Sequence, residues 1–571
     1  MFKTNLKIFF LTTVFLTIPT LVAAQVAQET NFNIDPSYDL DGRKEISATL
    51  QKTTNQLYFY ADAAWWNKLD SSDKTGIDRK LSDLGDEFER KIYPTLTSTF
   101  GSESKPGIDR DERITILIHP MIKEAGGYFN SGDVYSRLQN PRSNEREMIY
   151  LNAKHIDTAL AKVFLAHEFT HLITVNQKDL LRNVTEEVWL NEARAEYAPT
   201  LLGYDDTYKG SNLERRVKAF LEKPNDSLTE WLNREEDYGP INLFTQYLVD
   251  HYGKKILVDS LLSSKVGIPS INEALAKNGF KDDFSQIFTN WAIAVLVNNC
   301  KLGERYCYLN ENLKNLRITP TLYYLPLKAE SILSIFYRTT HWNCNWYKFI
   351  GGGQNLASEF KGDSSVEFKI PYLLCDFKGE CSVGFLILDE EQKGKITIPG
   401  FNAKYSSLTI IPFIKSKTSG FDGRENYFSF SWKITAQEES GAEGEAELIS
   451  QLLARIEELK RQIAEVRAKI NAISAQRGQK IGTCTFFENN LYYGIMNNPQ
   501  VRCLQEFLKS QGSEIYPEGL TTGNFLSLTQ QAVIRFQEKY NSEILKPLAL
   551  ERGTGYVGPL TRAKINQLSG F

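Results

Sequence analysis

Two of the six histidines, His167 and His171, lie four residues apart, and Glu168 directly follows the first of them. In an α-helix, residues at i and i+4 lie one above the other on the same face, so both imidazoles can direct a ring nitrogen at one metal ion. By chance, the pattern His-Glu-x-x-His is expected only about 0.004 times in a chain of this composition. The pattern therefore favours a metal site over an ordinary helix that happens to carry polar residues.

A zinc site that performs chemistry needs a third protein ligand and leaves a fourth position open. Twenty residues separate His171 from Glu192, which lies in the helical segment VWLNEARAEYAP. A short connection between two antiparallel helices would bring Glu192 to the histidines. Glu196, four residues further on, could then accept a hydrogen bond from the distal N–H of one histidine and fix its tautomer. The alternative for Glu196 is a surface carboxylate.

Glu168 is placed to act as a general base rather than as a ligand. It can accept a proton from a water molecule that zinc has acidified, and then pass that proton to the leaving amine of a peptide bond. Peptide hydrolysis also needs a donor for the developing oxyanion. The segment YGPINLFTQYLVDHYG offers four candidates, of which we favour the first and expect the others to be core or surface residues: Tyr238, Tyr247, His251 and Tyr252.

The length and composition of the chain indicate a globular protein of several domains. A chain of 571 residues is too long for one hydrophobic core, and about two to four domains are expected. Hydrophobic residues make up 42% and charged residues 24%, as in a well-packed globular protein. The formal net charge of −4 argues against a nucleic-acid partner.

The first 24 residues have the pattern of a secretory signal peptide: two lysines, an apolar run from Ile8 to Val22, and the small residues Ala23 and Ala24. An uncleaved membrane anchor is the alternative, although the run is short for a spanning helix. We therefore expect an exported protein, extracellular or periplasmic. Residues 25–45 are expected to be a linker or a short pro-segment.

Export permits disulfides. Proximity along the chain suggests three pairs among the seven cysteines: Cys300 with Cys307, Cys375 with Cys381, and Cys484 with Cys503. Cys344 is left over and is either free or paired in place of one of these.

Two features stand out downstream of the metal motif. From residue 319 to 436, short alternating segments separated by turns predict a β-sandwich. After an acidic linker, eight apolar residues follow at spacings of three and four: Ile449, Leu452, Ile456, Leu459, Ile463, Val466, Ile470 and Ile473. This seam predicts either a parallel dimer through residues 448–474 or a single solvated spacer helix.

HEFTH followed by WLNEARAEY resembles the gluzincin metallopeptidases, which hold zinc with two histidines and a distal glutamate. DEFERKIYPTLTSTFG, GIDRDERITILI, GGYFNSGDVY and SNEREMIYLNA are similar to the hyicolysin-type branch of secreted peptidases, over about residues 78–253. The resemblance implies zinc on His167, His171 and Glu192, with Glu168 as the base. Ala193 replaces the glycine usual after the ligand glutamate, and Tyr238 rests on a looser match.

The last segment resembles the peptidoglycan-binding-like domain, a small three-helix module. The match lies in VRCLQEFLKSQG, GNF, TQQAVIRFQEKY and GYVGPLTRAKINQL. Spacing predicts a core of five residues: Val501, Leu504, Leu508, Val533 and Phe536. Leu526 and Gln500 depart from the usual pattern, at positions where glycine and aspartate are common.

Together these observations predict a multidomain α+β protein. The expected parts are a signal peptide at 1–24, a thermolysin-like gluzincin catalytic domain at 46–318, a β-sandwich at 319–436, an acidic linker and coiled-coil helix at 437–480, and a peptidoglycan-binding-like domain at 481–571. The expected activity is zinc-dependent hydrolysis of proteins or peptides at or near the bacterial cell wall. The alternatives are a peptidase for peptidoglycan cross-links and a catalytically silent adhesin or scaffold attached to the wall.

Overall fold

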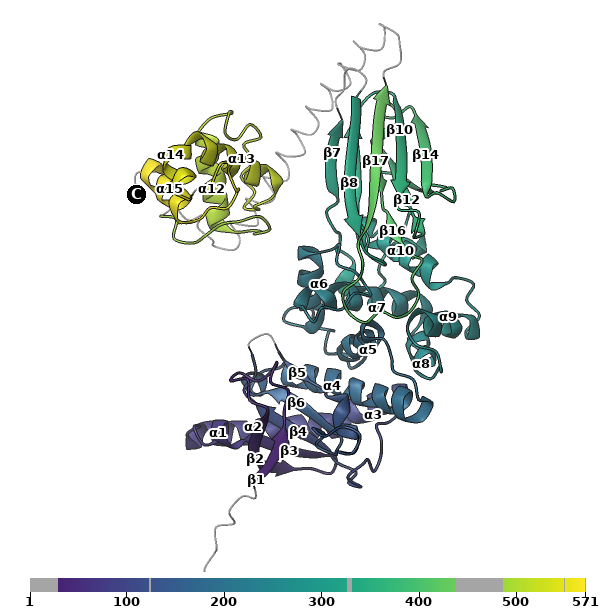
Figure 1. The fold of residues 1–571 in the computed structure, drawn as a ribbon, viewed down its shortest axis with the longest axis vertical. Helices are drawn as coiled ribbons and strands as arrows, with labels where there is room; N and C mark the ends of the chain where they lie inside the picture. Colours follow the sequence, from purple (N-terminus) through teal and green to yellow (C-terminus); the bar gives the residue numbers. More distant parts are fainter. Residues whose placement is uncertain (1–28, 123–124, 326–330, 438–485, 549, 570–571) are drawn as a thin grey trace, which may run out of the picture. The chain divides into compact units, whose positions relative to one another are not determined.

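The computed structural model describes residues 29–122, 125–325, 331–437, 486–548 and 550–569. The chain forms two compact units, Met1–Glu439 and Ser440–Phe571 (Figure 1). The expected signal peptide and the expected coiled coil at 448–474 lie outside the described residues. Within the described part, no helix combines the length and the apolar character needed to cross a bilayer.

A six-stranded sheet forms the N-terminal part of the first unit, in the order β1-β2-β3-β4-β6-β5. Its strands are β1 (Glu29–Asn33), β2 (Glu45–Thr53), β3 (Leu57–Asp62), β4 (Ile114–His119), β5 (Gly127–Tyr128) and β6 (Met148–Asn152). Parallel pairing joins β3 to β4 and β4 to β6, and every residue of β4 and β6 is buried. Strands buried on both faces read as continuous apolar runs, as ITILIH and MIYLN do.

Residues 29–45, part of the segment expected to be a linker or a short pro-segment, belong to the folded N-terminal region. From Glu29 onward they form the edge strand β1, which pairs antiparallel with β2, and Phe32 and Ile34 are buried. These residues are therefore part of the sheet. Whether they are also processed stays a prediction.

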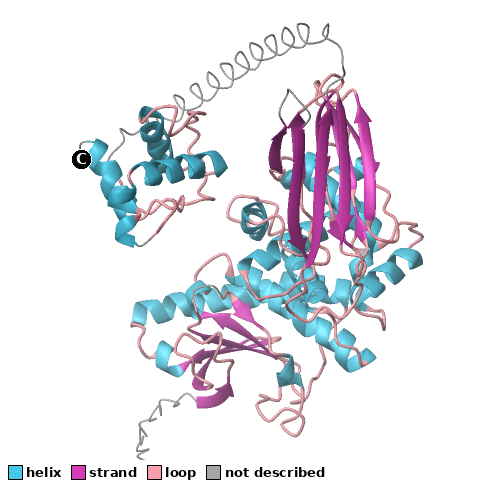
Figure 2. Cartoon of the chain, turned by 45° about the horizontal axis from the view of Figure 1, so that its top comes forward, coloured by secondary structure: helices cyan, strands magenta, loops and turns pink. Residues whose placement is uncertain are grey.

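Three helices cover one face of this sheet (Figure 2). They are α2 (Ser71–Glu87), α3 (Tyr93–Phe100) and α4 (Ala161–Val175), and a π-helical turn, Phe88–Ile92, joins α2 to α3. The Asp70 side chain accepts a hydrogen bond from the Asp73 N–H and so caps α2. The apolar stripe of the α2–α3 segment, from Leu81 to Phe100, packs against the same face as α4.

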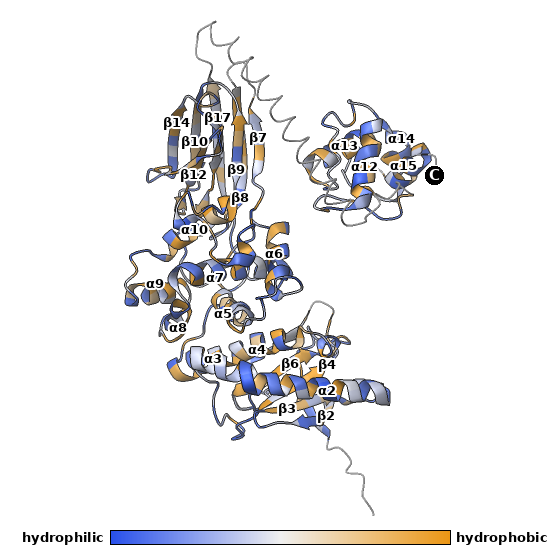
Figure 3. Cartoon of the chain, turned by 180° about the vertical axis from the view of Figure 1, so that it is seen from behind, coloured by the Kyte–Doolittle hydropathy of each residue, from blue (hydrophilic) through white to orange (hydrophobic). Residues whose placement is uncertain are grey.

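A layer of helices follows: α5 (Val188–Leu201), α6 (Asn212–Glu222), α7 (Tyr238–Tyr252), α8 (Lys255–Leu261), α9 (Gly267–Lys277) and α10 (Phe284–Val297). Large aromatic side chains fill its centre, among them Trp189, Phe244, Phe288 and Trp291. Figure 3 shows hydrophobic and hydrophilic residues mixed along these helices. The helical character predicted for the segment of Glu192 is confirmed in α5.

Residues 321–437 form two sheets that pack face to face around one apolar cluster. One has the order β14-β10-β17-β8 and the other β13-β12-β15-β9-β7. The strands are β7 (Thr321–Leu325), β8 (Ser331–Thr339), β9 (Tyr347–Gly351), β10 (Asn355–Gly362), β12 (Pro371–Asp376), β13 (Cys381–Phe385), β14 (Lys393–Pro399), β15 (Tyr405–Ile410) and β17 (Phe428–Gln437), with a small pair β11 (Phe368–Lys369) and β16 (Phe413–Ile414) beside them. The two facing sheets form a β-sandwich, as the alternating apolar and polar residues of these segments predict.

The base of the sandwich packs onto the helices. Trp342 lies 4.8 Å from Phe284 between ring centroids, and the indole N–H of Trp346 donates to the Ala292 carbonyl at 2.8 Å. Both tryptophans are buried and belong to the core.

Two of the expected disulfides are present, Cys300–Cys307 and Cys375–Cys381, and Cys344 is free and buried. The expected partner of Cys503, Cys484, lies outside the described residues.

The second unit contains α12 (Pro499–Ser510), α13 (Ser527–Lys539), α14 (Asn541–Ile544) and α15 (Pro559–Ser569), and the five expected core residues are buried. Two buried glutamines each hold a loop to a helix, in an arrangement that we call the glutamine clamp. Gln505 accepts from the Gly523 N–H and donates to the Asn524 carbonyl and to Thr529. Gln537 bonds in the same way to Gly555, Tyr556 and Thr561, at the same spacings along the chain.

A buried carboxyl group beside β6 gives the first unit a testable pH dependence. Burial raises the pKa of Glu147 to about 7, and the neighbouring carboxyls of Asp109 and Glu103 add to the effect. Since the pKa is higher in the folded state, the stability from this group is greatest below the unfolded value near 4.5 and is lost as the pH rises towards 7. We expect Glu147→Gln to reduce the loss of unfolding free energy between pH 5 and pH 8 by about 2 to 3 kcal/mol.

Urea denaturation at the two pH values measures this loss. Glu112→Gln is the matched control, because Glu112 is exposed beside the same loop. Equal pH dependence in the wild type and in Glu147→Gln would contradict the assignment.

Candidate metal centre

Helix α4 presents His167, Glu168 and His171 at the boundary between the sheet and the helical layer. Apart from Lys162, every residue of α4 is buried. Leu165, Phe169 and Leu172 pack into the core, which leaves the face with the two histidines directed at α5. The helix spacing therefore places both imidazoles as the sequence predicts.

Glu192 of α5 meets the two imidazoles. The Nε2 atoms of His167 and His171 are 3.1 Å apart, and the Glu192 carboxylate lies 3.2 Å from the first and 3.5 Å from the second. Zinc bonds of 2.0–2.1 Å in a tetrahedral site require ligand atoms about 3.3 Å apart. In addition, Glu192 Oε2 is buried without a hydrogen-bond donor. The donor set and its spacing fit a divalent metal ion, and within the described ranges no other such cluster occurs.

The other ring nitrogen of each histidine has its own partner on α5. His171 Nδ1 donates to Asn191 Oδ1 at 3.0 Å, and His167 Nδ1 lies 3.4 Å from Glu196 Oε1. A proton held on Nδ1 leaves Nε2 unprotonated and free to bind a metal. Glu196 thus has the position expected for a residue that orients a ligand, whereas Asn191 was not predicted from the sequence.

Glu196 is 1% exposed, so the surface alternative does not apply. The Arg216 guanidinium donates to both carboxylate oxygens, at 2.8 and 2.6 Å, and Asn212 and Asn242 each donate to Oε2 at 3.1 Å. Burial alone would raise the pKa of Glu196, but the charge and hydrogen bonds of Arg216 lower it to about 2. Glu196 therefore stays ionised and keeps the His167 ring in one orientation.

Glu168 lies in a different environment from Glu196. It is 6% exposed, and its carboxylate makes no hydrogen bond or ion pair with any residue that the structure describes. Burial raises its pKa. Gly127 of β5 permits this placement, because a Cβ added there would come within 3.3 Å of Glu168 Cγ and 2.6 Å of the Tyr150 carbonyl oxygen. A carboxylate without fixed partners is available to exchange a proton.

Tyr238, the first residue of α7, lies beside the centre. Its ring centroid is 6.4 Å from that of His167, and the Arg216 guanidinium packs on the ring at 4.0 Å. The ring also meets Trp231 edge to face, at 4.9 Å. Arg216 therefore positions both Glu196 and Tyr238.

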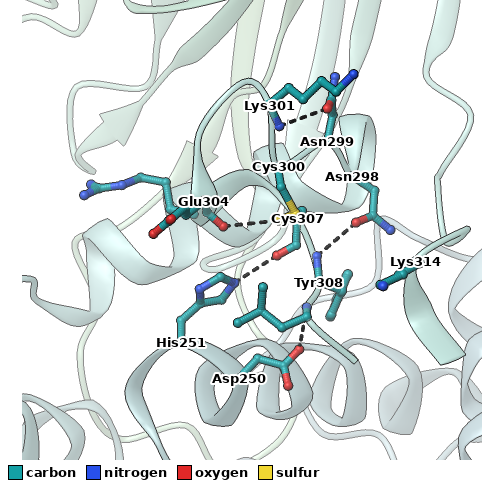
Figure 4. Close-up of a disulfide and its surroundings, with 12 residues drawn as sticks. Asp250, His251, Asn298, Asn299, Cys300, Lys301, Glu304, Cys307, Tyr308 and Lys314 are labelled. Carbon is teal, nitrogen blue, oxygen red and sulfur yellow. Dashed lines mark hydrogen bonds between the residues drawn. A yellow bond between two sulfur atoms is a disulfide. The ribbon is translucent and has the colours of Figure 1, made fainter. Parts of the chain in front are cut away.

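The three other candidates on α7 bond elsewhere. Tyr247 donates to the Arg305 carbonyl at 2.7 Å, and Tyr252 donates to Asp282 at 2.8 Å. His251 donates to the Cys307 carbonyl at 2.9 Å and points at the disulfide loop (Figure 4). These side chains hold the helical layer together, as expected for core and surface residues.

A buried ionic network, not predicted from the sequence, joins the two ligand helices. Lys178, in the π-helical turn after α4, and Arg194 of α5 are completely buried and share the Glu186 carboxylate, at 3.5 and 2.8 Å. Lys178 also donates to the Ser260 and Ser263 carbonyls, and burial lowers its pKa to about 8. The network anchors the connection between α4 and α5 to α8, so it fixes Glu192 relative to the histidines.

Comparison with known proteins found one relevant relative. The neutral metalloprotease ShpI of Staphylococcus hyicus is 27% identical over 250 residues, and the alignment covers 38% of this chain. Because it covers 53% of ShpI, the chain spans about half the length of the curated relative that it matches. The chain is similar to a metalloprotease. No family model matches it.

Two solved structures share low similarity with the chain. PliG of Aeromonas hydrophila, a periplasmic inhibitor of g-type lysozyme, is 10% identical, with a TM-score of 0.14 over 21% of this chain and 100% of its own. The 4-O-methyl-α-glucuronidase BtGH115A is 8% identical, with a TM-score of 0.12 over 58% of this chain and 52% of its own. Similarity at this level does not identify a common fold.

Proposed function

We propose that this protein is a gluzincin-type zinc endopeptidase that hydrolyses peptide bonds of proteins or peptides. The observation that carries the proposal is the meeting of His167, His171 and Glu192 at tetrahedral spacing, with the unpaired carboxylate of Glu168 beside them. Similarity to the metalloprotease ShpI supports the same conclusion. The residues present fit zinc, which accepts two imidazoles and a carboxylate and leaves one position open.

Zinc, when bound, would polarise the scissile carbonyl and acidify a water molecule. Glu168 would accept the proton of that water and donate it to the nitrogen of the leaving amine. Tyr238 would donate a hydrogen bond to the oxygen on which negative charge develops. Asn191 and Glu196 would hold the imidazole rings in the tautomer that this chemistry needs.

The same proposal includes where the protein acts and how it is held there. The N-terminal 24 residues would direct export to the extracellular space or the periplasm. The C-terminal module would bind peptidoglycan and so raise the concentration of the enzyme at the cell wall. Residues 448–474 would extend the chain as a spacer or join two copies in a parallel dimer.

Hydrolysis assays with the mature, zinc-loaded protein test the proposal. We expect it to cleave casein and to leave the cross-link peptides of purified peptidoglycan intact. Cleavage of cross-links without cleavage of casein would instead support a wall peptidase. A protein that binds wall material but hydrolyses neither substrate would be an adhesin or a scaffold, and the peptidase proposal would be wrong.

A further inference from the structure

Tyr38, in the segment between β1 and β2, is held rigidly on the sheet side of the metal centre. Its ring stacks on Tyr128 with centroids 4.6 Å apart, and Tyr128 stacks in turn on Tyr150 at 4.1 Å. The Tyr38 carbonyl accepts from the Ile122 N–H at 2.9 Å. The next residue, Asp39, is buried and paired with Arg43. Both the ring and the backbone of Tyr38 are thus fixed before any ligand arrives.

The stack packs on the face of the sheet turned away from α4, at the edge formed by β5. Tyr128 is the neighbour of Gly127 on β5, and Gly127 is the residue that approaches Glu168 most closely from this strand. Burial is the main cause of the raised pKa of Tyr38, and the carboxylates of Glu168 and Glu192 raise it further. The phenol is therefore within electrostatic range of the centre.

The Tyr38 hydroxyl has unused hydrogen-bonding capacity. Its oxygen accepts from Asn233 Nδ2 at 3.3 Å, while no residue in the described ranges accepts its hydrogen. Asn233 is exposed and lies in the connection between α6 and α7, two residues after Trp231, which contacts Tyr238. Tyr38 is thus hydrogen-bonded to the connection that carries Trp231 and leads into Tyr238.

We propose that Tyr38 is a substrate-binding residue whose hydroxyl donates a hydrogen bond to a backbone carbonyl of the bound polypeptide. A peptide offers a carbonyl acceptor at every residue, and the fixed phenol supplies the matching donor without rearrangement. The inference rests on the proposed peptidase function and adds a second phenol, from the N-terminal part of the unit, to that of Tyr238. The segment expected to be a linker would then form a wall of the substrate site.

Steady-state kinetics of Tyr38→Phe on a fluorogenic peptide test this contact, because phenylalanine keeps the stack on Tyr128 and removes only the hydroxyl. Loss of one neutral hydrogen bond to substrate is expected to raise KM by about 3- to 10-fold and to change kcat by less than about twofold. Bound zinc should not change. Tyr60→Phe, in the same sheet, is the matched control and should behave as wild type.

Asn233→Ala separates substrate binding from loop positioning. This variant keeps the phenol, so KM should stay within about twofold of wild type. If Asn233→Ala raises KM as much as Tyr38→Phe does, Tyr38 acts by holding the α6–α7 connection, and the inference is wrong. An unchanged KM in Tyr38→Phe, with an active wild type, would overturn this inference alone. An inactive wild type would overturn the proposed function and this inference with it.

Discussion

Glu168→Gln is expected to lower kcat/KM for a peptide substrate by roughly 10³-fold, while one zinc ion per chain stays bound. Glutamine has the same shape as glutamate, but it cannot accept a proton. The metal would be held by His167, His171 and Glu192, so the change at Glu168 removes no metal ligand. Since no described residue pairs with the Glu168 carboxylate, the change breaks no ion pair or hydrogen bond.

The measurement combines kcat/KM with metal analysis of the same preparations. Glu222→Gln serves as the control for an identical chemical change at an exposed position, the last residue of α6. It should match the wild type in both respects. If Glu168→Gln retained wild-type activity, Glu168 would have no part in proton transfer.

Glu192→Ala is expected to abolish metal retention and, with it, activity. Two imidazoles alone make an incomplete site for zinc, which in catalytic centres has three protein ligands. Among the described residues, the substitution also removes the only negative charge that contacts both Nε2 atoms. After dialysis against a weak chelator, we expect the wild type to keep about one equivalent of zinc and Glu192→Ala to keep less than about a tenth.

Two measurements report this loss: zinc content by elemental analysis, and thermal unfolding with and without added zinc. Zinc should raise the unfolding temperature of the wild type and of Glu222→Ala, but not that of Glu192→Ala, because only binding to the folded state stabilises it. A full equivalent of zinc in Glu192→Ala would mean that the third ligand is another residue.

The part of the site that the sequence predicts is the part set by helix geometry. His167, Glu168 and His171 are tied together by the 3.6-residue period, and the pair Glu192 and Glu196 follows the same rule on the next helix. Each of these residues lies where that rule places it. Tyr238 was favoured among four candidates in one segment on a looser family match, and its ring lies 6.4 Å from that of His167 between centroids.

The residues that support the site could not be predicted in this way. Arg216 is 20 residues from Glu196 in the sequence, and Asn242 is 46 residues from it, yet both donate hydrogen bonds to its carboxylate. Lys178 and Arg194 meet at Glu186 only after three helices have packed. Such contacts depend on tertiary packing, and nothing in local spacing indicates them.

The N-terminal segment was misjudged for a related reason. FNIDPSYDLDG is polar and rich in turn residues, which is typical of a linker. Its place in the sheet depends on backbone pairing with β2 and on two buried apolar side chains, Phe32 and Ile34. A short edge strand carries too little apolar periodicity to stand out in a sequence.

The glutamine clamp of the second unit bears on what a matching sequence pattern means. The side chains of Gln505, Gln537 and their threonine partners are turned inward and fully engaged with the module's own loops. These positions, together with the glycines that they hold, make up much of the sequence pattern that resembles the peptidoglycan-binding-like domain. Matching residues at these positions therefore reflect the requirements of this fold, and they do not by themselves indicate a ligand.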